Sequence, residues 1–244
     1  MYTFNYQRPT SLATAVSSGQ GDSRFLAGGQ SLVQAMKMRL ASAPTLVDLA
    51  GLAELKGITV AANTVTIGAM VKHSEVAASA EVRRAIPALA DLAGGIGDRM
   101  VRNMGTLGGS LANSDPAACY PAAVLGLGAT IKTDRRTLNG DEFFKGLYET
   151  ALQPGEIIVS VTFNVPQKAA YIKFKQPASR FALVGVFVSQ GTSGVRVGVT
   201  GAKACAYRSA ELEQALSANF TAAAAAAVKV VATDINADLH ASST

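Results

Sequence analysis

The stretch from Gly94 to Ser110 constrains the fold more than any other part of this sequence. It mixes glycines with hydroxyl and amide side chains, ends in Thr106-Leu107-Gly108-Gly109-Ser110, and shows no hydrophobic period. A segment of this kind is not expected in a hydrophobic core, so it either faces solvent or wraps a polar ligand. Because the stretch is long and its second half, Val101 to Ser110, carries a single charged residue, we expect it to wrap a ligand.

A second glycine-rich loop, Ala27-Gly28-Gly29-Gln30-Ser31, lies between a predicted strand and a predicted helix. Paired glycines permit positive φ angles and a close approach of a ligand to the backbone. Amide groups at a helix start attract anions, so this loop is either an ordinary turn or a phosphate site. Neither loop has the Rossmann motif, G-x-G-x-x-G after a strand, and neither contains the G-K-[ST] of a P-loop. Together they predict a dinucleotide site of another architecture.

Hydrophobic periodicity and turn residues predict an α+β chain that opens with a β-loop-α-β unit. Its character changes after Pro166, which places a domain boundary near Val165. Strands are expected over 24–27, 45–49, 58–69 (as a hairpin), 129–133, 157–163, 170–174, 181–189 and 195–200. Helices are expected over 10–18, 31–40, 73–92 with a break at Pro87, 117–127, 140–148 and 209–231.

The scarcity of metal-ligating residues excludes several kinds of site. The two cysteines, Cys119 and Cys205, cannot supply the four ligands of an iron–sulfur cluster, and the isolated His73 and His240 give no zinc spacing. Ser31, Ser110 and Ser114 have no histidine in a supporting motif, and Asp115 and Glu156 do not form a recognisable carboxylate pair. The sequence therefore predicts neither a metal site nor a catalytic residue.

The distribution of charge suggests what the chain contacts. Its net charge of +5 comes without a lysine or arginine run, which argues against nucleic-acid binding. Residues 157–210 contain seven basic and no acidic residues: Lys168, Lys173, Lys175, Arg180, Arg196, Lys203 and Arg208. This segment is either a solvated basic face or a surface for an anionic cofactor or an acidic partner.

Composition supports a folded protein with surface to bury. Hydrophobic residues make up 49% of the chain and charged residues 16%, which permits a sizeable core and favours partner subunits. The first ten residues contain no apolar signal-peptide core, and the apolar run at 222–228 is too short to span a membrane. We therefore expect a cytoplasmic location and no membrane span.

Both loops and several further segments resemble the FAD-binding medium subunit of the molybdenum hydroxylases, the xanthine dehydrogenase and carbon monoxide dehydrogenase family. The matching segments, in order, are FNYQRPTSL, AGGQSL, MKMRLASAPTLVDLAGLAELKGI, TIGAMVKHSEVA, VRNMGTLGGSLANSDPAA, GDEFFKGLYETALQPGEIIVSVTFNVP and YIKFKQPASRFALVGVFV. They extend over nearly the whole chain, so chance similarity is an inadequate explanation.

The resemblance implies an α+β fold and a division of labour between subunits. The expected fold is a two-subdomain FAD-binding domain of the PCMH type over 1–165, with subdomains of about 1–56 and 57–165. A smaller C-terminal α/β domain is expected over 166–244. The chain would carry FAD, whereas a large subunit would carry the molybdenum cofactor and a small subunit the [2Fe–2S] clusters. The assembly would be a dimer of heterotrimers that passes electrons from the clusters to an external acceptor.

The resemblance also assigns cofactor contacts by position. The FAD pyrophosphate would be held by backbone N–H groups in 27–31 and 106–109, with Ser110 and Asp115 on the ribityl and flavin side. Ile158 would pack near the ring, and Lys173, or Lys175, would lie near its polar edge; a surface lysine is the alternative. The expected contact residues are Leu26, Ala27, Gly28, Gly29, Gln30, Ser31, Leu32, Thr106, Leu107, Gly108, Gly109, Ser110, Asp115, Ile158 and Lys173.

Two departures from the family pattern stand out. Relatives commonly carry Asp or Glu where this chain has Cys119, so a carboxylate contact from that position is absent. They also usually continue beyond Thr244 with another helical segment, which leaves the completeness of the chain open. Two alternative functions remain: a stand-alone FAD oxidase of similar fold, and a flavin-free assembly module.

Overall fold

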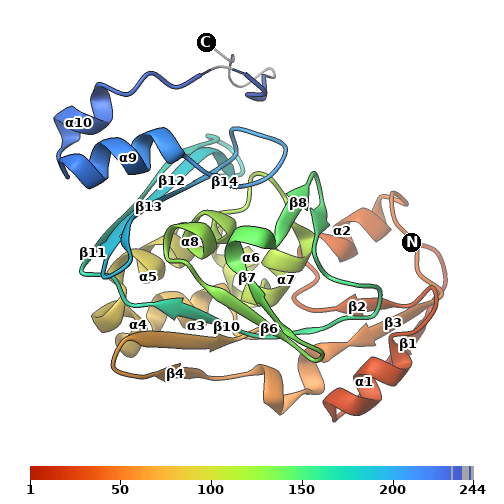
Figure 1. Cartoon of the computed structure of the whole chain (residues 1–244). Helices are drawn as coiled ribbons and strands as arrows, with labels where there is room; N and C mark the ends of the chain where they lie inside the picture. Colours follow the sequence, from red (N-terminus) through yellow and green to blue (C-terminus); the bar gives the residue numbers. More distant parts are fainter. Residues whose placement is uncertain (232, 238–241, 243–244) are drawn as a thin grey trace.

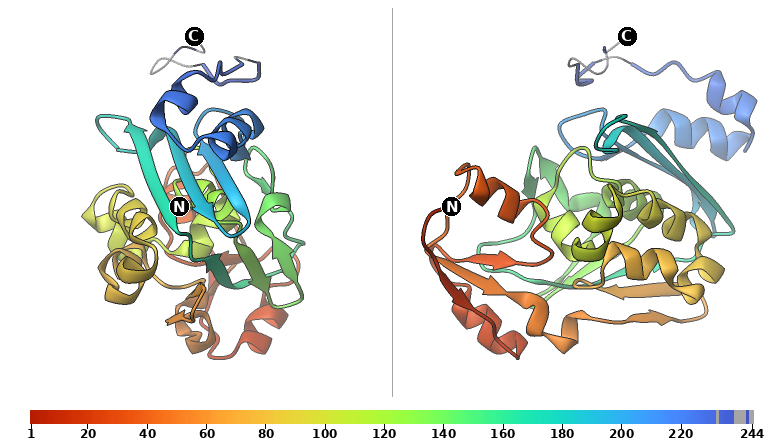
Figure 2. Two further views of the ribbon diagram at one scale, coloured as in Figure 1. Left: turned by 60° about the vertical axis from the view of Figure 1, so that its left-hand side comes forward. Right: turned by 180° about the vertical axis from the view of Figure 1, so that it is seen from behind.

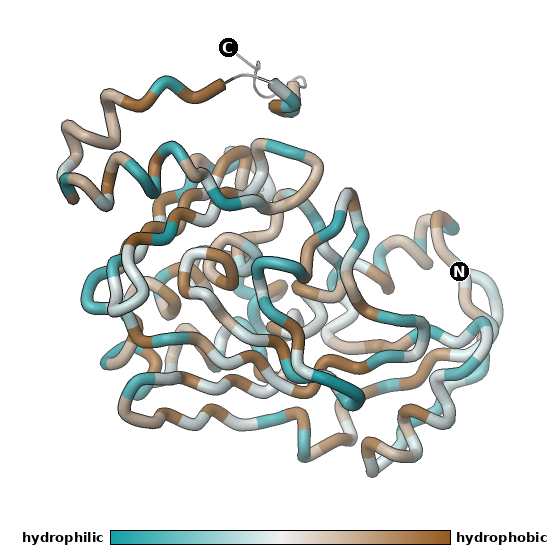
Figure 3. Tube along the Cα trace, in the orientation of Figure 1, coloured by the Kyte–Doolittle hydropathy of each residue, from teal (hydrophilic) through white to brown (hydrophobic). Residues whose placement is uncertain are grey.

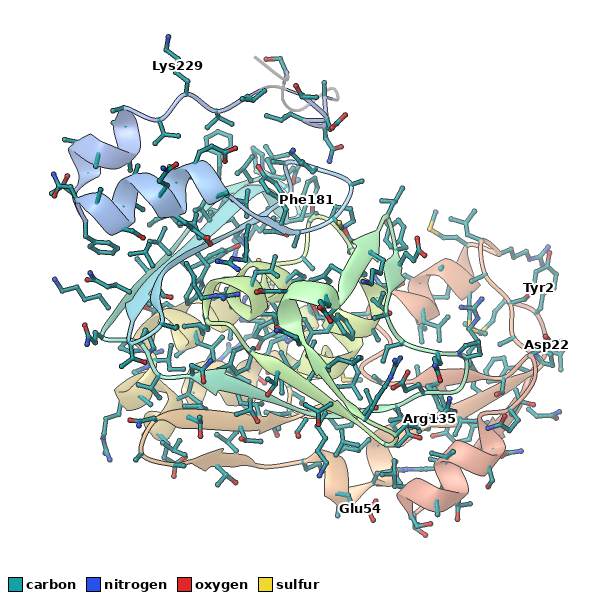
Figure 4. The ribbon with its side chains drawn as sticks, viewed as in Figure 1. Tyr2, Asp22, Glu54, Arg135, Phe181 and Lys229 are labelled. Atoms are coloured by element: carbon teal, nitrogen blue, oxygen red, sulfur yellow. The ribbon has the colours of Figure 1, made fainter. Side chains whose placement is uncertain are left out.

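The computed structural model describes residues 1–231, 233–237 and 242 of the chain. Within them, a layer of helices lies between a central sheet and a C-terminal sheet, and a small N-terminal sheet flanks these layers (Figure 1). Two further views show the same order, with the last two helices on the outside of the C-terminal sheet (Figure 2). Side chains fill the space between the layers (Figure 4).

The N-terminal sheet places the first glycine-rich loop. Its strands pair in the order β1-β3-β2, and both outer strands run parallel to β3. The elements are β1 (Asn5–Gln7), α1 (Leu12–Ser18), β2 (Arg24–Leu26), α2 (Leu32–Lys37), β3 (Thr45–Asp48) and the 3₁₀ turns η1 (Leu49–Gly51) and η2 (Ala53–Leu55). The β-loop-α-β order of β2, α2 and β3 confirms the prediction.

The central sheet is antiparallel and has the strand order β4-β5-β10-β6-β7. Its strands are β4 (Ile58–Val60), β5 (Thr64–Gly68), β6 (Thr130–Thr133), β7 (Thr137–Asn139) and β10 (Ile158–Asn164). The predicted hairpin around Asn63 and Thr64 is confirmed by β4 and β5. Val65, Ile67 and Phe163 alternate with polar residues and are fully buried in the main core.

A layer of short helices covers this buried face of the sheet. They are α3 (His73–Ala78), α4 (Ala80–Ala85), α5 (Pro87–Gly94), α6 (Arg99–Met104), α7 (Leu107–Asn113) and α8 (Tyr120–Gly126). The predicted helix over 73–92 is divided at Pro87, as expected, because proline is accepted at the first position of α5. It is also divided at Ser79, whose hydroxyl caps α4.

The expectation that the glycine-rich stretch avoids the core is wrong. Leu107, Gly108 and Leu111 are fully buried in α7. The polar side chains serve as helix caps instead, because Asp98 accepts the Val101 amide and Thr106 accepts the Gly109 amide. The composition of the stretch therefore reflects closely packed helix starts.

The C-terminal sheet is antiparallel in the order β11-β12-β13-β14 and separates two helical layers. Its elements are β11 (Lys168–Lys175), β12 (Ala182–Gly191), β13 (Gly194–Thr200), β14 (Tyr207–Arg208), α9 (Ala210–Ala218) and α10 (Ala222–Ala226). Helix α8 packs on one face, where a Cβ atom at Gly198 would lie 2.2 Å from the Ala122 carbonyl oxygen. Hydrophobic residues recur along β12 and β13 (Figure 3), and Val195, Val197 and Val199 of β13 are buried in a cluster with Leu216 of α9.

The predicted strands after Pro166 are confirmed as β11 to β13, and the predicted C-terminal helices as α9 and α10. Strand β10 belongs to the central sheet and β11 to the C-terminal sheet, yet Phe187 of β12 is buried in the main core beside α8. The division into 1–165 and 166–244 stays a prediction. His240 lies outside the described residues.

The helix predicted over 140–148 is wrong. The segment forms a 3₁₀ turn, η3 (Gly140–Glu142), followed by the hairpin β8 (Phe144–Gly146) and β9 (Glu149–Thr150). Phe143 and Phe144 pack edge to face, with ring centroids 5.2 Å apart, and both are buried. Two adjacent buried rings do not suit one face of a helix, and Tyr148 at φ 56° supplies the turn.

Glu156 fixes the start of β10 through a buried carboxylate. It accepts bonds from Arg136 Nε and Nη2, both at 2.9 Å, from the Thr133 hydroxyl at 2.8 Å and from the Gln153 amide at 2.7 Å. The bond from Arg136 is the main cause that lowers the pKa of Glu156 to about 2, although burial opposes it. The carboxylate therefore stays charged in the folded protein down to strongly acidic pH.

Glu156→Gln is expected to lower the free energy of unfolding by about 2 kcal/mol at neutral pH, because a charge-assisted set of bonds is lost. Since the folded pKa lies below the ordinary 4.5, this stabilisation is present above pH 4.5 and disappears as the pH falls towards 2. Urea unfolding at several pH values measures both effects. Equal pH dependence for the variant and the wild type would contradict this account.

Within the described residues, no helix is long and apolar enough to cross a membrane. The same part of the chain contains no cluster of three or more His, Cys, Asp or Glu side chains that could hold a metal ion.

Candidate cofactor site

The first glycine-rich loop presents a row of unpaired amides. It joins the half-buried end of β2 to α2, and Gly29 adopts φ 70°, where a Cβ atom would lie 2.8 Å from Val33 Cγ2. In the described structure, the amides from Gly28 to Leu32 donate no hydrogen bond to the protein, and Ser31 makes no capping bond. Consecutive unpaired N–H groups ahead of a helix suit a phosphate or another anion.

The second loop is held against the end of β5. The amides of Leu107 and Gly108 donate to the carbonyl oxygens of Val71 at 3.0 Å and Ala69 at 2.8 Å. With the Gly109 amide on Thr106 Oγ1 at 3.2 Å, three amides of this loop have partners inside the protein. A Cβ atom at Gly108 would lie 2.6 Å from Ala69 Cβ, so this glycine serves packing.

The two loops, remote in sequence, touch each other. A Cβ atom at Gly28 would lie 2.2 Å from the Met104 carbonyl oxygen and 2.6 Å from Gly105 Cα. A Cβ atom at Gly109 would lie 3.2 Å from Ala27 Cβ. The structure thus brings together the residues that sequence analysis assigned to pyrophosphate binding, and glycine at 28 and 109 permits this approach.

Ser110 and Asp115 lie on the segment that leaves this junction. Ser110 is half-buried in α7, and Asp115 Oδ1 accepts the Ala117 amide at 2.9 Å in the turn before α8. The hairpin β8–β9 packs over the turn, because the Ser114 hydroxyl donates to the Glu149 carbonyl at 3.2 Å. The charge of Asp115 is the main cause that raises the pKa of Tyr148 on this hairpin.

Ile158 lies beneath the second loop. Its side chain is buried in the main core at the start of β10. The next residue, Val159, accepts the Ala69 amide at 2.9 Å, and Ala69 in turn accepts the Gly108 amide. The strand that carries Ile158 is therefore tied to the second loop through Val159 and Ala69, and the contact of Ile158 with the flavin ring stays a prediction.

Lys173 is held at a fixed point on the inner face of β11. Its Nζ donates to the Gly95 carbonyl at 2.6 Å, the Arg180 carbonyl at 2.8 Å and Cys119 Sγ at 3.5 Å. An ammonium group has three donors, so all three are engaged. The thiol is the weakest of these acceptors, which makes its donor the easiest to redirect. The neighbour, Lys175, is exposed and makes none of these bonds.

A pocket of about 330 Å³ opens beside Lys173, and sequence analysis missed most of it. It is lined by Asp91, Gly94, Gly95, Gly97, Arg102, Tyr171, Lys173, Lys175 and Arg180. Arg102 is anchored by the carbonyl oxygens of Ile96 and Gly97, at 3.0 and 3.1 Å. The acid-free segment 157–210 was a signal for Lys175 and Arg180, but no sequence signal placed Arg102 beside them.

Buried aromatic groups separate the pocket from the main core. His73 packs against Tyr120, with ring centroids 5.4 Å apart, and its Nε2 lies 2.6 Å from the position of a Cβ atom at Gly105. Burial, with help from the charge of Arg102, lowers the pKa of His73 to about 4, so the imidazole is neutral at neutral pH. Burial also raises the pKa of Tyr171. Of these groups Tyr171 lines the pocket, and its neutral side chain adds no negative charge there; the lining carboxylate, Asp91, pairs with Arg83.

Comparison with known proteins gives consistent matches. Residues 2–167 match the family described as "FAD binding domain in molybdopterin dehydrogenase". The carbon monoxide dehydrogenase medium chain of Hydrogenophaga pseudoflava is 36% identical over 84% of this chain and 77% of its own. The glyceraldehyde dehydrogenase medium chain of Sulfolobus acidocaldarius is 34% identical over 75% of this chain and 68% of its own.

Solved structures agree with these matches. Carbon monoxide dehydrogenase from Hydrogenophaga pseudoflava superposes with a TM-score of 0.86 at 33% identity, over 91% of this chain and 83% of that chain. Quinoline 2-oxidoreductase from Pseudomonas putida 86 superposes with a TM-score of 0.87 at 28% identity, over 99% of this chain and 90% of that chain. The predicted α+β fold is confirmed by these neighbours.

Proposed function

Because this chain belongs to the family of FAD-binding domains in molybdopterin dehydrogenases, we propose that its two touching glycine-rich loops hold FAD. The chain is an FAD-carrying electron-transfer subunit of a molybdenum hydroxylase and is therefore part of an oxidoreductase. Partner subunits in this family carry the molybdenum cofactor and the iron–sulfur clusters. No observation favours a stand-alone oxidase or a flavin-free module.

The residues present fit a pyrophosphate. The single observation that carries this proposal is the row of unpaired amides from Gly28 to Leu32, set against the second loop at Gly109. The amides of Leu107, Gly108 and Gly109 already have partners inside the protein. The second loop therefore contributes to the cofactor site mainly through glycine backbone that a ligand can approach closely, and less through these N–H groups. We assign the phosphate contacts mainly to the first loop, Ala27 to Ser31, flanked by Leu26 and Leu32.

The remaining FAD contacts are assigned from the positions of the elements that follow the junction of the two loops. Ser110 and Asp115 follow the junction along α7 and the turn before α8, which suits the ribityl side of the cofactor. Lys173, beyond Cys119, supplies a fixed positive charge at the pocket and can redirect the donor that now meets the thiol. Ile158 supports the second loop from the core. FAD supplies electron transfer when bound, and these residues bind it, orient it and set its electrostatic surroundings.

The chain works in a multi-subunit complex, because its relatives are medium chains and subunits of dehydrogenases. We propose a dimer of heterotrimers in the cytoplasm, with a large molybdenum-cofactor subunit and a small iron–sulfur subunit. Relatives named for carbon monoxide, glyceraldehyde and nicotine share this fold, which supports a substrate site on the large subunit. The division at about residue 165, with subdomains 1–56 and 57–165, belongs to the same proposal.

Hydrogen exchange tests the cofactor site directly. Amides without a protein partner should exchange rapidly in the FAD-free chain and become protected when FAD occupies the site. We therefore expect a peptide covering 26–33 to gain protection on FAD addition, at one FAD per chain, whereas the β12–β13 turn at 190–195 should not change. Full FAD binding with unchanged exchange at 26–33 would contradict the assignment.

A further inference from the structure

The positive charge of the chain is unevenly distributed. Residues 166–181 carry four basic and no acidic residues, and residues 80–104 add four basic and three acidic residues. Together the two segments carry a net charge of +5. An uneven distribution of this size creates a directed field, which a uniformly charged surface does not.

The fold brings the two segments side by side. Helix α5 packs against the edge strand β11, and both views of the ribbon place them together (Figures 1 and 2). At the end of β11 near Lys175, α5 and β11 border the pocket beside Lys173. At the other end, Arg84 and Lys168 line a second hollow with Pro87. We call this surface the basic face; its cations are Arg84, Arg102, Lys168, Lys173, Lys175 and Arg180.

The cations of the basic face are not neutralised. Its one lining carboxylate, Asp91, already pairs with Arg83 at 3.0 Å. Arg102 and Lys173 bond to neutral carbonyls, and in the described part of the chain Lys175 and Arg180 form no ion pair. Unpaired cations gathered on one face fit an anionic partner.

Apolar side chains beside these cations favour a protein over a small ion. Ile172 is 74% exposed and Phe174 is 71% exposed, and both point to the opposite side of the edge strand β11 from Lys173, because side chains alternate along a strand; a protein that extends round this edge can contact both sides, whereas a small ion cannot. They lie on the outer side of the edge strand, where α9 and α10 pack mainly on β13. Exposed aromatic surface bordered by arginine and lysine is typical of protein interfaces.

We propose that the basic face is the docking surface for an acidic electron-carrier protein that accepts electrons from this subunit. The inference rests on the proposed function, because it places the acceptor at the mouth of the pocket beside Lys173. An acidic carrier docked there is steered by the unpaired cations and, where it extends round the edge of β11, contacts Ile172 and Phe174 on the outer side. Three cations, Arg102, Lys175 and Arg180, line the same pocket as Lys173.

The test uses the intact complex and a small acidic [2Fe–2S] ferredoxin as the probe. Its dissociation constant is measured at low ionic strength for the wild type, for Lys175→Glu/Arg180→Glu, and for the control Lys56→Glu/Lys132→Glu. Both control lysines are exposed and lie outside the basic face, and the change in net charge is the same. We expect the first pair to weaken binding about 10-fold or more and the control to change it by less than about 3-fold.

The rate at which the pre-reduced complex reduces the ferredoxin, compared at equal FAD content, should fall in the Lys175→Glu/Arg180→Glu variant together with the affinity. An equal loss of ferredoxin affinity in the variant and in the control would overturn the proposal. So would a wild-type complex that does not bind the ferredoxin, or one that binds a basic cytochrome c as tightly as the ferredoxin. Displacement of the ferredoxin by duplex DNA at lower concentration would assign the face to nucleic acid and also overturn it. Absence of FAD from the chain would instead refute the proposed function, since the binding measurement needs no flavin.

Discussion

Replacing Gly28 with valine is expected to weaken FAD binding by about 100-fold, the equivalent of roughly 3 kcal/mol, while the chain stays folded. The added Cβ atom would lie 2.2 Å from the Met104 carbonyl oxygen, so the two loops must move apart. Gly28 is only half-buried and lies outside the hydrophobic clusters, so the change acts on the loops more than on the core. Flavin content after purification and an FAD titration by fluorescence measure it.

Gly191→Val is the matched control, because the nearest atom to its Cβ position is Pro166 Cα at 3.9 Å and its φ is not positive. It should retain stoichiometric FAD. Gly108→Val is less informative, since Gly108 packs on Ala69 and its replacement would disturb the core as well. Stoichiometric FAD in folded Gly28→Val would mean that the approach of the two loops is not part of the cofactor site.

Local signals in the sequence were sufficient to place the two loops and most strands. The glycine pair at Gly28 and Gly29 follows a short strand, and the structure confirms both the strand and the positive φ at Gly29. The strands after Pro166 follow from alternation of apolar residues, which reports directly on burial. These features depend on neighbours in the chain, which is why the sequence predicts them.

What sequence reasoning missed depends on contacts between distant residues. The approach of Gly28 to Met104 and the three acceptors around Lys173 join elements that are far apart in the chain. The burial of Leu107 was missed because caps and close helix packing use the same small polar residues as loops. The hairpin at 144–150 replaced a predicted helix because the burial of two adjacent phenylalanines outweighed local propensity.

The isolated chain, loaded with FAD, is expected to oxidise no organic substrate over multiple turnovers. Its described residues contain no metal-ligand cluster, and the one strongly acidic buried carboxylate, Glu156, is committed to Arg136. His73 is buried against Tyr120 beneath Gly105 and is neutral, so it is not placed as an acid or base for a substrate. We therefore expect the activation of an organic substrate to occur outside the described residues of this chain.

The measurement compares the FAD-loaded chain with the intact complex, using heterocycles and aldehydes as substrates and dichlorophenolindophenol as the artificial acceptor. Dithionite-reduced chain must still reduce the dye, which shows that the bound flavin is competent. We expect steady turnover by the complex with its own substrate, and no reduction of the dye by any substrate with the chain alone. Multiple turnovers of one such substrate by the isolated chain would contradict the electron-transfer account and identify a stand-alone oxidase.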